Sequence, residues 1–144
     1  MDKNKYKHNS SFSLSVKRSK SGLGVFSNEA IKKGKFILEY SGELIPNEEA
    51  DRRGGRYLFN INSRWTVDGR KLENLSRYLN HSCRPNCEVK TRGKKILIYS
   101  YKNIKAGDEL TYDYGKDYFD QYIKPHGCRC EKCLKKQSLK TEVK

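Results

Sequence analysis

The feature that most constrains this chain is an eight-residue stretch, residues 80–87, which reads Asn-His-Ser-Cys-Arg-Pro-Asn-Cys. It contains one imidazole, two side-chain amides and two thiols, and Pro85 stops a helix from running through it. Polar groups packed this densely are costly to bury unless they bind a ligand or one another. The stretch therefore predicts a ligand-binding loop around which the rest of the chain is organised.

Two later stretches supply complementary chemistry. Residues 109–115 read Glu-Leu-Thr-Tyr-Asp-Tyr-Gly, and residues 128–133 read Cys-Arg-Cys-Glu-Lys-Cys. Because side chains alternate along a strand, Tyr112 and Tyr114 are expected on one face. We expect the first stretch to hold a ligand, the second to perform chemistry beside it and the third to close over both.

Length and composition favour one intracellular domain. A chain of 144 residues leaves little room for a second domain, and no apolar run approaches the roughly 20 residues of a membrane-spanning helix. Without such a run no membrane contact is expected, and the charged N-terminus predicts no secretory signal. Five cysteines then argue against a disulfide framework and favour metal ligation. Cys128, Cys130 and Cys133 need one more soft ligand for a tetrahedral zinc site.

Much of the net charge of +14 lies at the ends of the chain. Residues 1–20 contain six Lys or Arg and one acidic residue, and residues 135–144 contain four and one. Solvated basic tails explain this pattern as well as attraction to nucleic acid or to an acidic partner does. Because the tails lack interleaved aromatic residues, any nucleic-acid contact is expected to be weak and electrostatic.

Short alternating runs predict many strands and little helix. Strands are expected at residues 11–18, 36–40, 56–61, 64–67, 94–101 and 110–114. Helices are expected at residues 46–53 and at 72–79. Gly22 and Gly24 are expected in a turn, or in a loop whose backbone N–H groups approach a ligand closely. No internal repeat and no βαβ pattern is visible, which argues against a Rossmann fold or a TIM barrel. The chain therefore predicts a mainly β fold of short strands in small sheets.

Six motifs follow one another along the chain. They are Gly22-Leu23-Gly24, Tyr40-Ser41-Gly42-Glu43, Tyr57-Leu58-Phe59, residues 77–86, residues 109–115 and the terminal Cys-x-Cys-x-x-Cys. Together they resemble the SET-domain protein lysine methyltransferases over roughly residues 11 to 134. The resemblance implies the family's β-clip fold, in which the C-terminal segment passes through a knot-like core. It divides the chain into a basic N-terminal tail (1–10), a SET domain (11–117), a post-SET zinc-binding segment (118–134) and a basic C-terminal tail (135–144).

The resemblance also implies methyl transfer from S-adenosylmethionine to a protein lysine, with S-adenosylhomocysteine as product. Tyr114 matches the family's catalytic tyrosine beside the transferring methyl group, and Tyr40 matches a tyrosine that lines the lysine channel. Tyr112 matches the position that sets the number of methyl groups added. A tyrosine there holds a water and narrows the channel, so monomethylation is predicted.

The expected substrate is a histone or another basic or chromatin-associated protein. That substrate implies the nucleus or chromatin if the source or its host is eukaryotic, and a microbial cytoplasm otherwise. Donor-binding positions implied by the resemblance are Gly22, Leu23, Tyr57, Arg77, Asn80, His81 and, as a lid over the adenine, Leu134. Arg77 suits the donor's carboxylate through a forked contact, and the amide oxygen of Asn80 suits its ammonium.

The implied zinc ligands are Cys83, Cys128, Cys130 and Cys133. Only two residues separate the last two cysteines, where the family usually has four, but this spacing still permits chelation. Cys87 is left over and is expected to be a small buried strand residue.

Two other functions fit parts of the pattern. The net charge and the cysteine triad also fit a non-catalytic zinc-containing basic module that binds nucleic acid or chromatin. Such a module has no need of Tyr40 and Tyr114 beside a donor-binding loop, and it predicts no donor binding. A family member that has lost activity is the third alternative, and the oligomeric state is not predicted.

Overall fold

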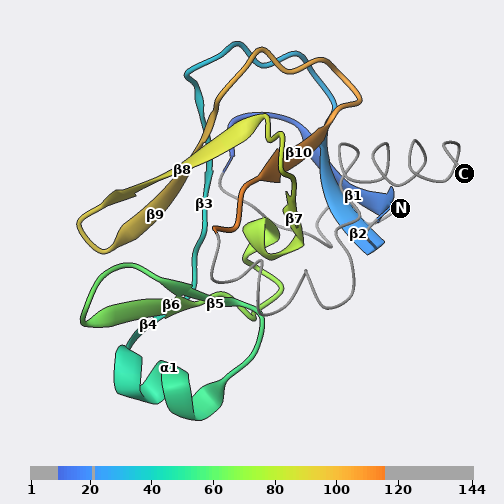
Figure 1. Ribbon diagram of the computed structural model, residues 1–144. Helices are drawn as coiled ribbons and strands as arrows, with labels where there is room; N and C mark the ends of the chain where they lie inside the picture. The colour runs from blue at the N-terminus through green and yellow to red at the C-terminus, as the bar shows by residue number, and fades with distance from the viewer. Residues whose placement is uncertain (1–9, 21, 116–144) are drawn as a thin grey trace, which may run out of the picture.

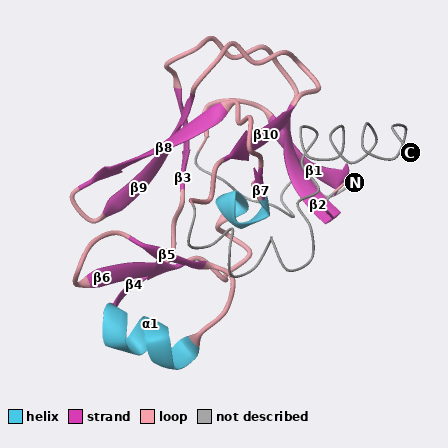
Figure 2. Cartoon of the chain, in the orientation of Figure 1, coloured by secondary structure: helices cyan, strands magenta, loops and turns pink. Residues whose placement is uncertain are grey.

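The computed structural model describes residues 10–20 and 22–115, whose strands form three small sheets (Figure 1). In chain order the elements are β1 (Leu14–Ser19), β2 (Gly22–Ser27), β3 (Phe36–Glu39), β4 (Glu43–Pro46), α1 (Asn47–Arg53), β5 (Leu58–Asn60), β6 (Trp65–Asp68), the 3-10 helix η1 (Leu75–Tyr78), β7 (Asn80–His81), β8 (Cys87–Arg92), β9 (Lys95–Ser100) and β10 (Glu109–Tyr112). The strand orders are β1-β2-β10-β7, β3-β9-β8 and β4-β6-β5. The predicted mainly β fold is confirmed (Figure 2).

Some expectations concern residues outside the described ranges. These are most of the N-terminal tail, the post-SET segment, the C-terminal tail and the threading of the C-terminal segment. Within the described ranges, no helix is long and apolar enough to cross a membrane.

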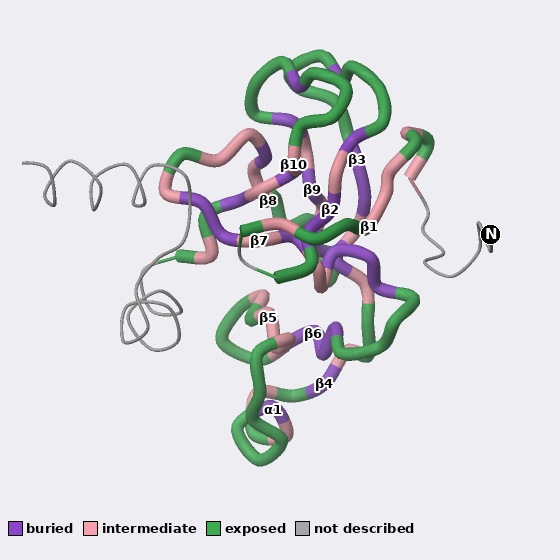
Figure 3. The backbone as a smooth tube through the Cα atoms, turned by 90° about the vertical axis from the view of Figure 1, so that its right-hand side faces the viewer, coloured by how far each residue is buried: buried purple, intermediate pink, exposed green. Residues whose placement is uncertain are grey.

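One buried cluster joins the three sheets. Val25 and Leu110 come from the first sheet, Ile37 and Ile98 from the second and Val67 from the third, and none of these side chains is more than 4% exposed. Figure 3 shows the buried segments on the strands at the centre of the molecule and the exposed segments mainly in the connecting loops. Burial of each such side chain stabilises the fold by about 1.5–3 kcal/mol, which fixes the relative positions of the strands that carry the site.

The pairing of β7 with β10 positions that site. The two strands run parallel, with Asn80 opposite Thr111 and His81 opposite Tyr112. The side chain of Asn86 reinforces the contact, because its amide nitrogen donates to the Glu109 carbonyl (2.8 Å) and its oxygen accepts from the Thr111 amide (2.9 Å). The polar stretch at residues 80–87 therefore lies against the tyrosine-containing strand end, although the two are about 30 residues apart in sequence.

Several details differ from the sequence-based expectations, and the strands β7 and β8 lie outside the predicted strand ranges. Gly22 and Gly24 lie within β2, paired with β1, rather than in a turn. The short strand β4 was not predicted, because only four residues pair there, with β6. The helix expected over residues 72–79 is only the four-residue η1, and Leu72 is 57% exposed, so the leucine spacing overstated the helix.

Candidate active site

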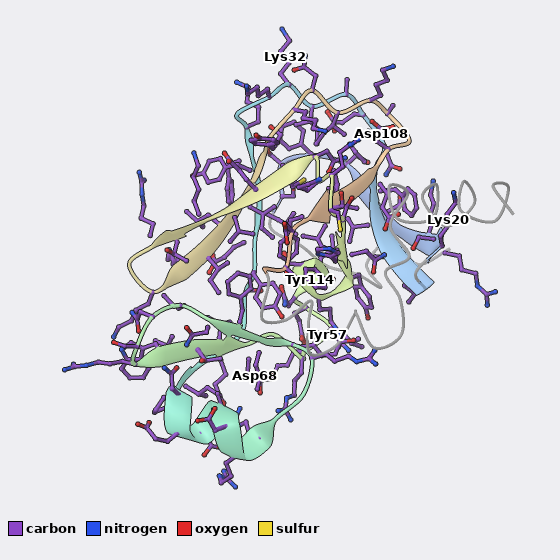
Figure 4. All side chains as sticks on the ribbon, viewed as in Figure 1. Lys20, Lys32, Tyr57, Asp68, Asp108 and Tyr114 are labelled. Carbon is purple, nitrogen blue, oxygen red and sulfur yellow. The ribbon has the colours of Figure 1, made fainter. Side chains whose placement is uncertain are left out.

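A cavity of about 260 Å³ opens between the β4-β6-β5 sheet, η1 and the end of β10. Figure 4 shows two of its lining residues, Tyr57 and Tyr114, near the centre of the molecule. The residues that line it are Tyr40, Arg56, Tyr57, Leu58, Phe59, Asn60, Ser76, Arg77, Leu79, Tyr112 and Tyr114. Five of the predicted site residues therefore meet at one cavity: Tyr40, Tyr57, Arg77, Tyr112 and Tyr114.

Aromatic rings form one wall of this cavity. The ring of Phe59 lies between Tyr40, at a centroid distance of 5.2 Å, and Tyr112, at 6.4 Å. The Tyr112 ring in turn lies 4.8 Å from that of Tyr114. Gly69 leaves room for this wall, since a Cβ atom there would come within 2.5 Å of the Tyr40 ring. A wall of this kind excludes water and disfavours a charged amine in the cavity.

Two tyrosine hydroxyls donate their protons to backbone carbonyls. The Tyr40 hydroxyl donates to the Tyr57 carbonyl (2.8 Å), and the Tyr114 hydroxyl donates to the Leu79 carbonyl. A hydroxyl has only one proton, so any further group that contacts these oxygens meets lone pairs. The cavity thus has oxygen acceptors suited to a positively polarised group.

Asn80 lies beside the cavity without lining it. Its amide nitrogen lies within hydrogen-bond distance of the Leu23 carbonyl (3.0 Å), the Glu109 carboxylate (2.7 Å) and the Ser19 hydroxyl (3.1 Å). The first two groups only accept hydrogen bonds, which fixes the orientation of the amide. The amide oxygen therefore points away from them, and it accepts no hydrogen bond from the rest of residues 10–20 and 22–115.

Gly24 makes this arrangement possible. A Cβ atom at Gly24 would lie 2.3 Å from the Glu109 carboxylate oxygen and 3.1 Å from the Asn80 amide nitrogen. Gly24 is therefore needed for the close approach of Glu109 and Asn80 to β2. A glycine can take this role within a strand.

The Arg77 guanidinium lies on the rings of two tyrosines. Its carbon is 4.3 Å from the Tyr57 ring centroid and 5.2 Å from that of Tyr78. One terminal nitrogen donates to the Arg70 carbonyl. The Nε atom is buried and has no hydrogen-bond partner in the described part of the chain. A buried donor without an acceptor is costly, so this nitrogen is suited to an anionic or polar ligand group.

His81 is 8% exposed, and its ring contacts other residues of the protein. Its Nδ1 atom accepts from the Tyr114 amide (3.1 Å), which places the proton on Nε2, 3.4 Å from the Cys83 sulfur. Burial lowers the pKa of His81, and the nearby carboxylate of Asp113 partly opposes that shift. The neutral imidazole thus orients the chain at Tyr114, whose ring centroid lies 5.3 Å from its own.

Of the four predicted zinc ligands, only Cys83 lies within the described residues. That residue is half-buried, and the described residues contain no cluster of three potential metal ligands. Cys128, Cys130, Cys133 and Leu134 lie outside the described ranges, so the zinc site and the lid stay predictions. Cys87 is 1% exposed in β8, as expected, and burial raises its thiol pKa to about 12.

Sequence reasoning missed three contributors to the site. Phe59 joins Tyr40 to Tyr112, the Leu79 carbonyl holds the Tyr114 hydroxyl, and Glu109 orients Asn80. Phe59 and Glu109 lie in two of the six motifs, but neither motif indicates which side chain each residue contacts. Leu79 acts through its backbone, and its residue type therefore gives no signal.

Comparison with known proteins places this arrangement in a family. The SET domain model matches residues 22–115. The chain is 41% identical over 111 residues to "Histone-lysine N-methyltransferase SUV39H2" of Xenopus tropicalis, covering 65% of this chain and 27% of that protein. It is 40% identical over 127 residues to "Histone-lysine N-methyltransferase 2D" of Homo sapiens, covering 79% of this chain and 2% of that protein.

A third relative comes from fission yeast. "Histone-lysine N-methyltransferase, H3 lysine-4 specific" of Schizosaccharomyces pombe is 43% identical over 105 residues, covering 64% of this chain and 11% of that protein. The chain thus spans about a quarter or less of the length of these three relatives. The match to the SET domain model covers well over half of the chain and includes the cavity with its tyrosines. The chain belongs to the SET-domain family.

Proposed function

We propose that this protein is an S-adenosylmethionine-dependent protein-lysine N-methyltransferase. The observation that supports this proposal most is the pair of tyrosine hydroxyls, Tyr40 and Tyr114, on one aromatic cavity. Both have already donated their protons to backbone carbonyls. Such oxygens stabilise positive charge that develops on a transferring methyl group, and the apolar wall keeps water away.

The residues present fit the methyl donor. Its ammonium requires an acceptor, which the amide oxygen of Asn80 provides. Its carboxylate requires donors, which Arg77 provides through the Nε that has no partner among the described residues. The backbone of Gly22 and Leu23 lies next to Asn80, as the hydrogen bond from Asn80 to the Leu23 carbonyl indicates. When bound, S-adenosylmethionine supplies a sulfonium methyl group that a nitrogen lone pair can displace in line.

The chain's own residues align the acceptor and control its charge. A lysine side chain that enters the cavity along the wall formed by Tyr40, Phe59 and Tyr112 would leave water, which lowers its pKa and favours the neutral amine that attacks. The Tyr114 hydroxyl oxygen faces the developing positive charge. Two hydrogen bonds fix its position, one from the hydroxyl to the Leu79 carbonyl and one from the Tyr114 backbone amide to the His81 ring. Most of the rate enhancement then comes from alignment rather than from acid–base chemistry.

The substrate class proposed is a histone or another basic, chromatin-associated protein, because the relatives are named histone-lysine N-methyltransferases. Such a substrate implies a nuclear or chromatin location. Attraction of a basic tail requires acidic groups near the cavity. Glu43 and Glu49 are already paired with Arg53, so the tail must compete with that arginine for them or use other carboxylates.

The test is to incubate the zinc-replete protein with labelled S-adenosylmethionine and a panel of histones and cell-extract proteins. Tyr114→Phe should lower labelling of lysine by about a hundredfold or more, since one preorganised oxygen is lost. The matched control is Tyr99→Phe, which removes a hydroxyl from β9 outside the cavity. If calorimetry detects no donor binding, the proposal fails and the non-catalytic basic module becomes the better reading. Donor binding with no effect of Tyr114→Phe on labelling would contradict the catalytic role.

A further inference from the structure

Five lysines gather at one end of the molecule, on two loops that precede β3 and β10. They are Lys32, Lys33, Lys35, Lys102 and Lys105, and we refer to them as the lysine platform. All five are exposed. Figure 4 shows Lys32 at the end of the molecule opposite α1, with the cavity residue Tyr114 between them.

The two loops are held together at their bases. Ile31 and Ile104, each at most 2% exposed, form an antiparallel bridge with hydrogen bonds of 2.9 and 2.7 Å. The Lys33 amide donates to the side chain of Asn103 (2.9 Å), and the Ser100 hydroxyl donates to the Lys32 carbonyl (2.6 Å). The spacing of the lysine backbones is therefore set by the fold.

Among the described residues, no acidic side chain neutralises the charge of the lysine platform. None of the ion pairs within residues 10–20 and 22–115 involves a platform lysine. The two acidic residues on the same loops bond to backbone amides: Glu29 accepts from Ser13 (2.8 Å) and Asp108 accepts from Lys105 (3.0 Å). Over residues 28–35 and 101–108, five lysines thus face two carboxylates.

We propose that the lysine platform binds the phosphate backbone of nucleic acid. Protein interfaces are depleted of lysine at their centre and use apolar anchors, whereas phosphate backbones bind clustered lysines through counterion release. A cluster of lysines without ion pairs among the described residues fits a phosphate backbone better than it fits a protein interface. No platform residue lines the cavity, so nucleic acid and a protein substrate would use different residues. The inference does not rest on the proposed catalytic function, because backbone binding needs no methyl transfer.

The test is fluorescence anisotropy with a labelled 25-base-pair DNA duplex of arbitrary sequence, at several salt concentrations. The platform variant is Lys32→Gln/Lys33→Gln/Lys105→Gln. A matched control, Arg92→Gln/Lys94→Gln/Lys95→Gln, removes the same charge around the turn between β8 and β9. Both variants keep the terminal tails, and unchanged thermal unfolding verifies that both fold.

Each lysine–phosphate contact contributes about 0.9 to the slope of log K against log salt. The platform variant should therefore lower the slope by about 2 to 3 and weaken binding in 0.1 M salt by about a hundredfold or more. The control should change affinity by less than about threefold. Equal losses in both variants would mean that net charge alone matters, and unchanged affinity in the platform variant would assign binding to other parts of the chain. Either result overturns the proposal.

Discussion

Single residues in this site act mainly through hydrogen bonds to the backbone. The Tyr40 and Tyr114 hydroxyls are each oriented by a carbonyl, and the His81 ring accepts from a backbone amide. A backbone partner cannot change rotamer, so the two tyrosine hydroxyl oxygens have little freedom to move away from the cavity.

Tyr112→Phe should shift the product from monomethyl-lysine toward dimethyl- and trimethyl-lysine. The ring would keep its contacts with Phe59 and Tyr114, but loss of the hydroxyl removes the group expected to hold a water and narrow the channel. Mass spectrometry of the modified substrate over time measures the distribution. Tyr99→Phe, outside the cavity, is the control, and an unchanged distribution in Tyr112→Phe would contradict the assigned role.

Gly24→Ala should weaken donor binding and lower the free energy of unfolding by about 1–3 kcal/mol. The added Cβ would meet the Glu109 carboxylate at 2.3 Å and must separate it from Asn80, leaving the amide without its closest acceptor. Calorimetric titration with S-adenosylmethionine and urea unfolding measure the two effects. Glu109→Gln, which keeps a similar size and an acceptor oxygen, should be milder, and wild-type donor affinity in Gly24→Ala would rule the mechanism out.

Among the secondary-structure elements, α1 is attached to the β4-β6-β5 sheet by a network of ion pairs. Arg53 at the end of α1 contacts Glu43 of β4 and Asp68 of β6, both at 2.9 Å, and Glu49 within α1 at 2.8 Å. Arg70 adds a second contact to Asp68 at 2.8 Å. Burial by itself would raise the pKa of Asp68, but the hydrogen bonds from Arg70 and Arg53 lower it below its usual 3.8.

Asp68→Asn should therefore destabilise the fold in a pH-dependent way. A carboxylate with a lowered pKa in the folded state contributes stability that is present above about pH 3.8 and is lost as the pH falls through the folded value. The variant should be less stable than wild type by about 1–3 kcal/mol at pH 7, and the difference should shrink below pH 3.8. Urea unfolding at pH 7, 5 and 3 measures this. The control is Asp51→Asn, at an exposed position of α1 without an ion pair among the described residues, whose stability should differ little from that of wild type. A loss of stability in Asp68→Asn that is the same at all three pH values would contradict the proposed coupling between Asp68 ionisation and folding.

The sequence predicts secondary-structure elements best where apolar and polar side chains alternate strongly. In β9, Ile96, Ile98 and Ser100 are all at most 1% exposed, as their spacing indicates. Alternation gives no signal for β4. The Gly22 to Gly24 segment is expected in a turn but lies in a strand, because glycine indicates a flexible backbone and does not indicate whether the backbone pairs with another strand. The segments Ile31-Lys32-Lys33-Gly34 and Ile104-Lys105-Ala106-Gly107 are also alike in sequence, and the structure pairs their two isoleucines.

Motif order predicts the cavity better than it predicts individual contacts. Tyr40, Tyr57, Arg77, Tyr112 and Tyr114 were expected in one site, and they line one cavity. Gly22, Leu23, Asn80 and His81 were expected in the same site but do not line that cavity. The contacts among these residues depend on strand register and on backbone carbonyls such as that of Leu79, and neither is specified by residue type.

For the molecule as a whole, the position of Cys83 links the site to the C-terminal part of the chain. Cys83 follows β7 and lies beside His81, which orients Tyr114. If Cys128, Cys130 and Cys133 complete a zinc site with Cys83, the metal joins the end of the chain to the strand pair that positions Tyr114, the proposed catalytic residue. Metal removal would then affect both stability and activity.

We expect one zinc ion per chain, measured by elemental analysis of the purified protein. A chelator should lower the unfolding temperature by about 5 °C or more, because metal that binds only the folded state stabilises it. Cys83→Ser should abolish zinc binding by removing one of four thiolates. Cys87→Ser is the matched control: its thiol is buried in β8 with a pKa raised to about 12, so the variant should lose stability yet keep one zinc. Full zinc content in Cys83→Ser, or loss of zinc in a folded Cys87→Ser, would show that the ligand set is wrong.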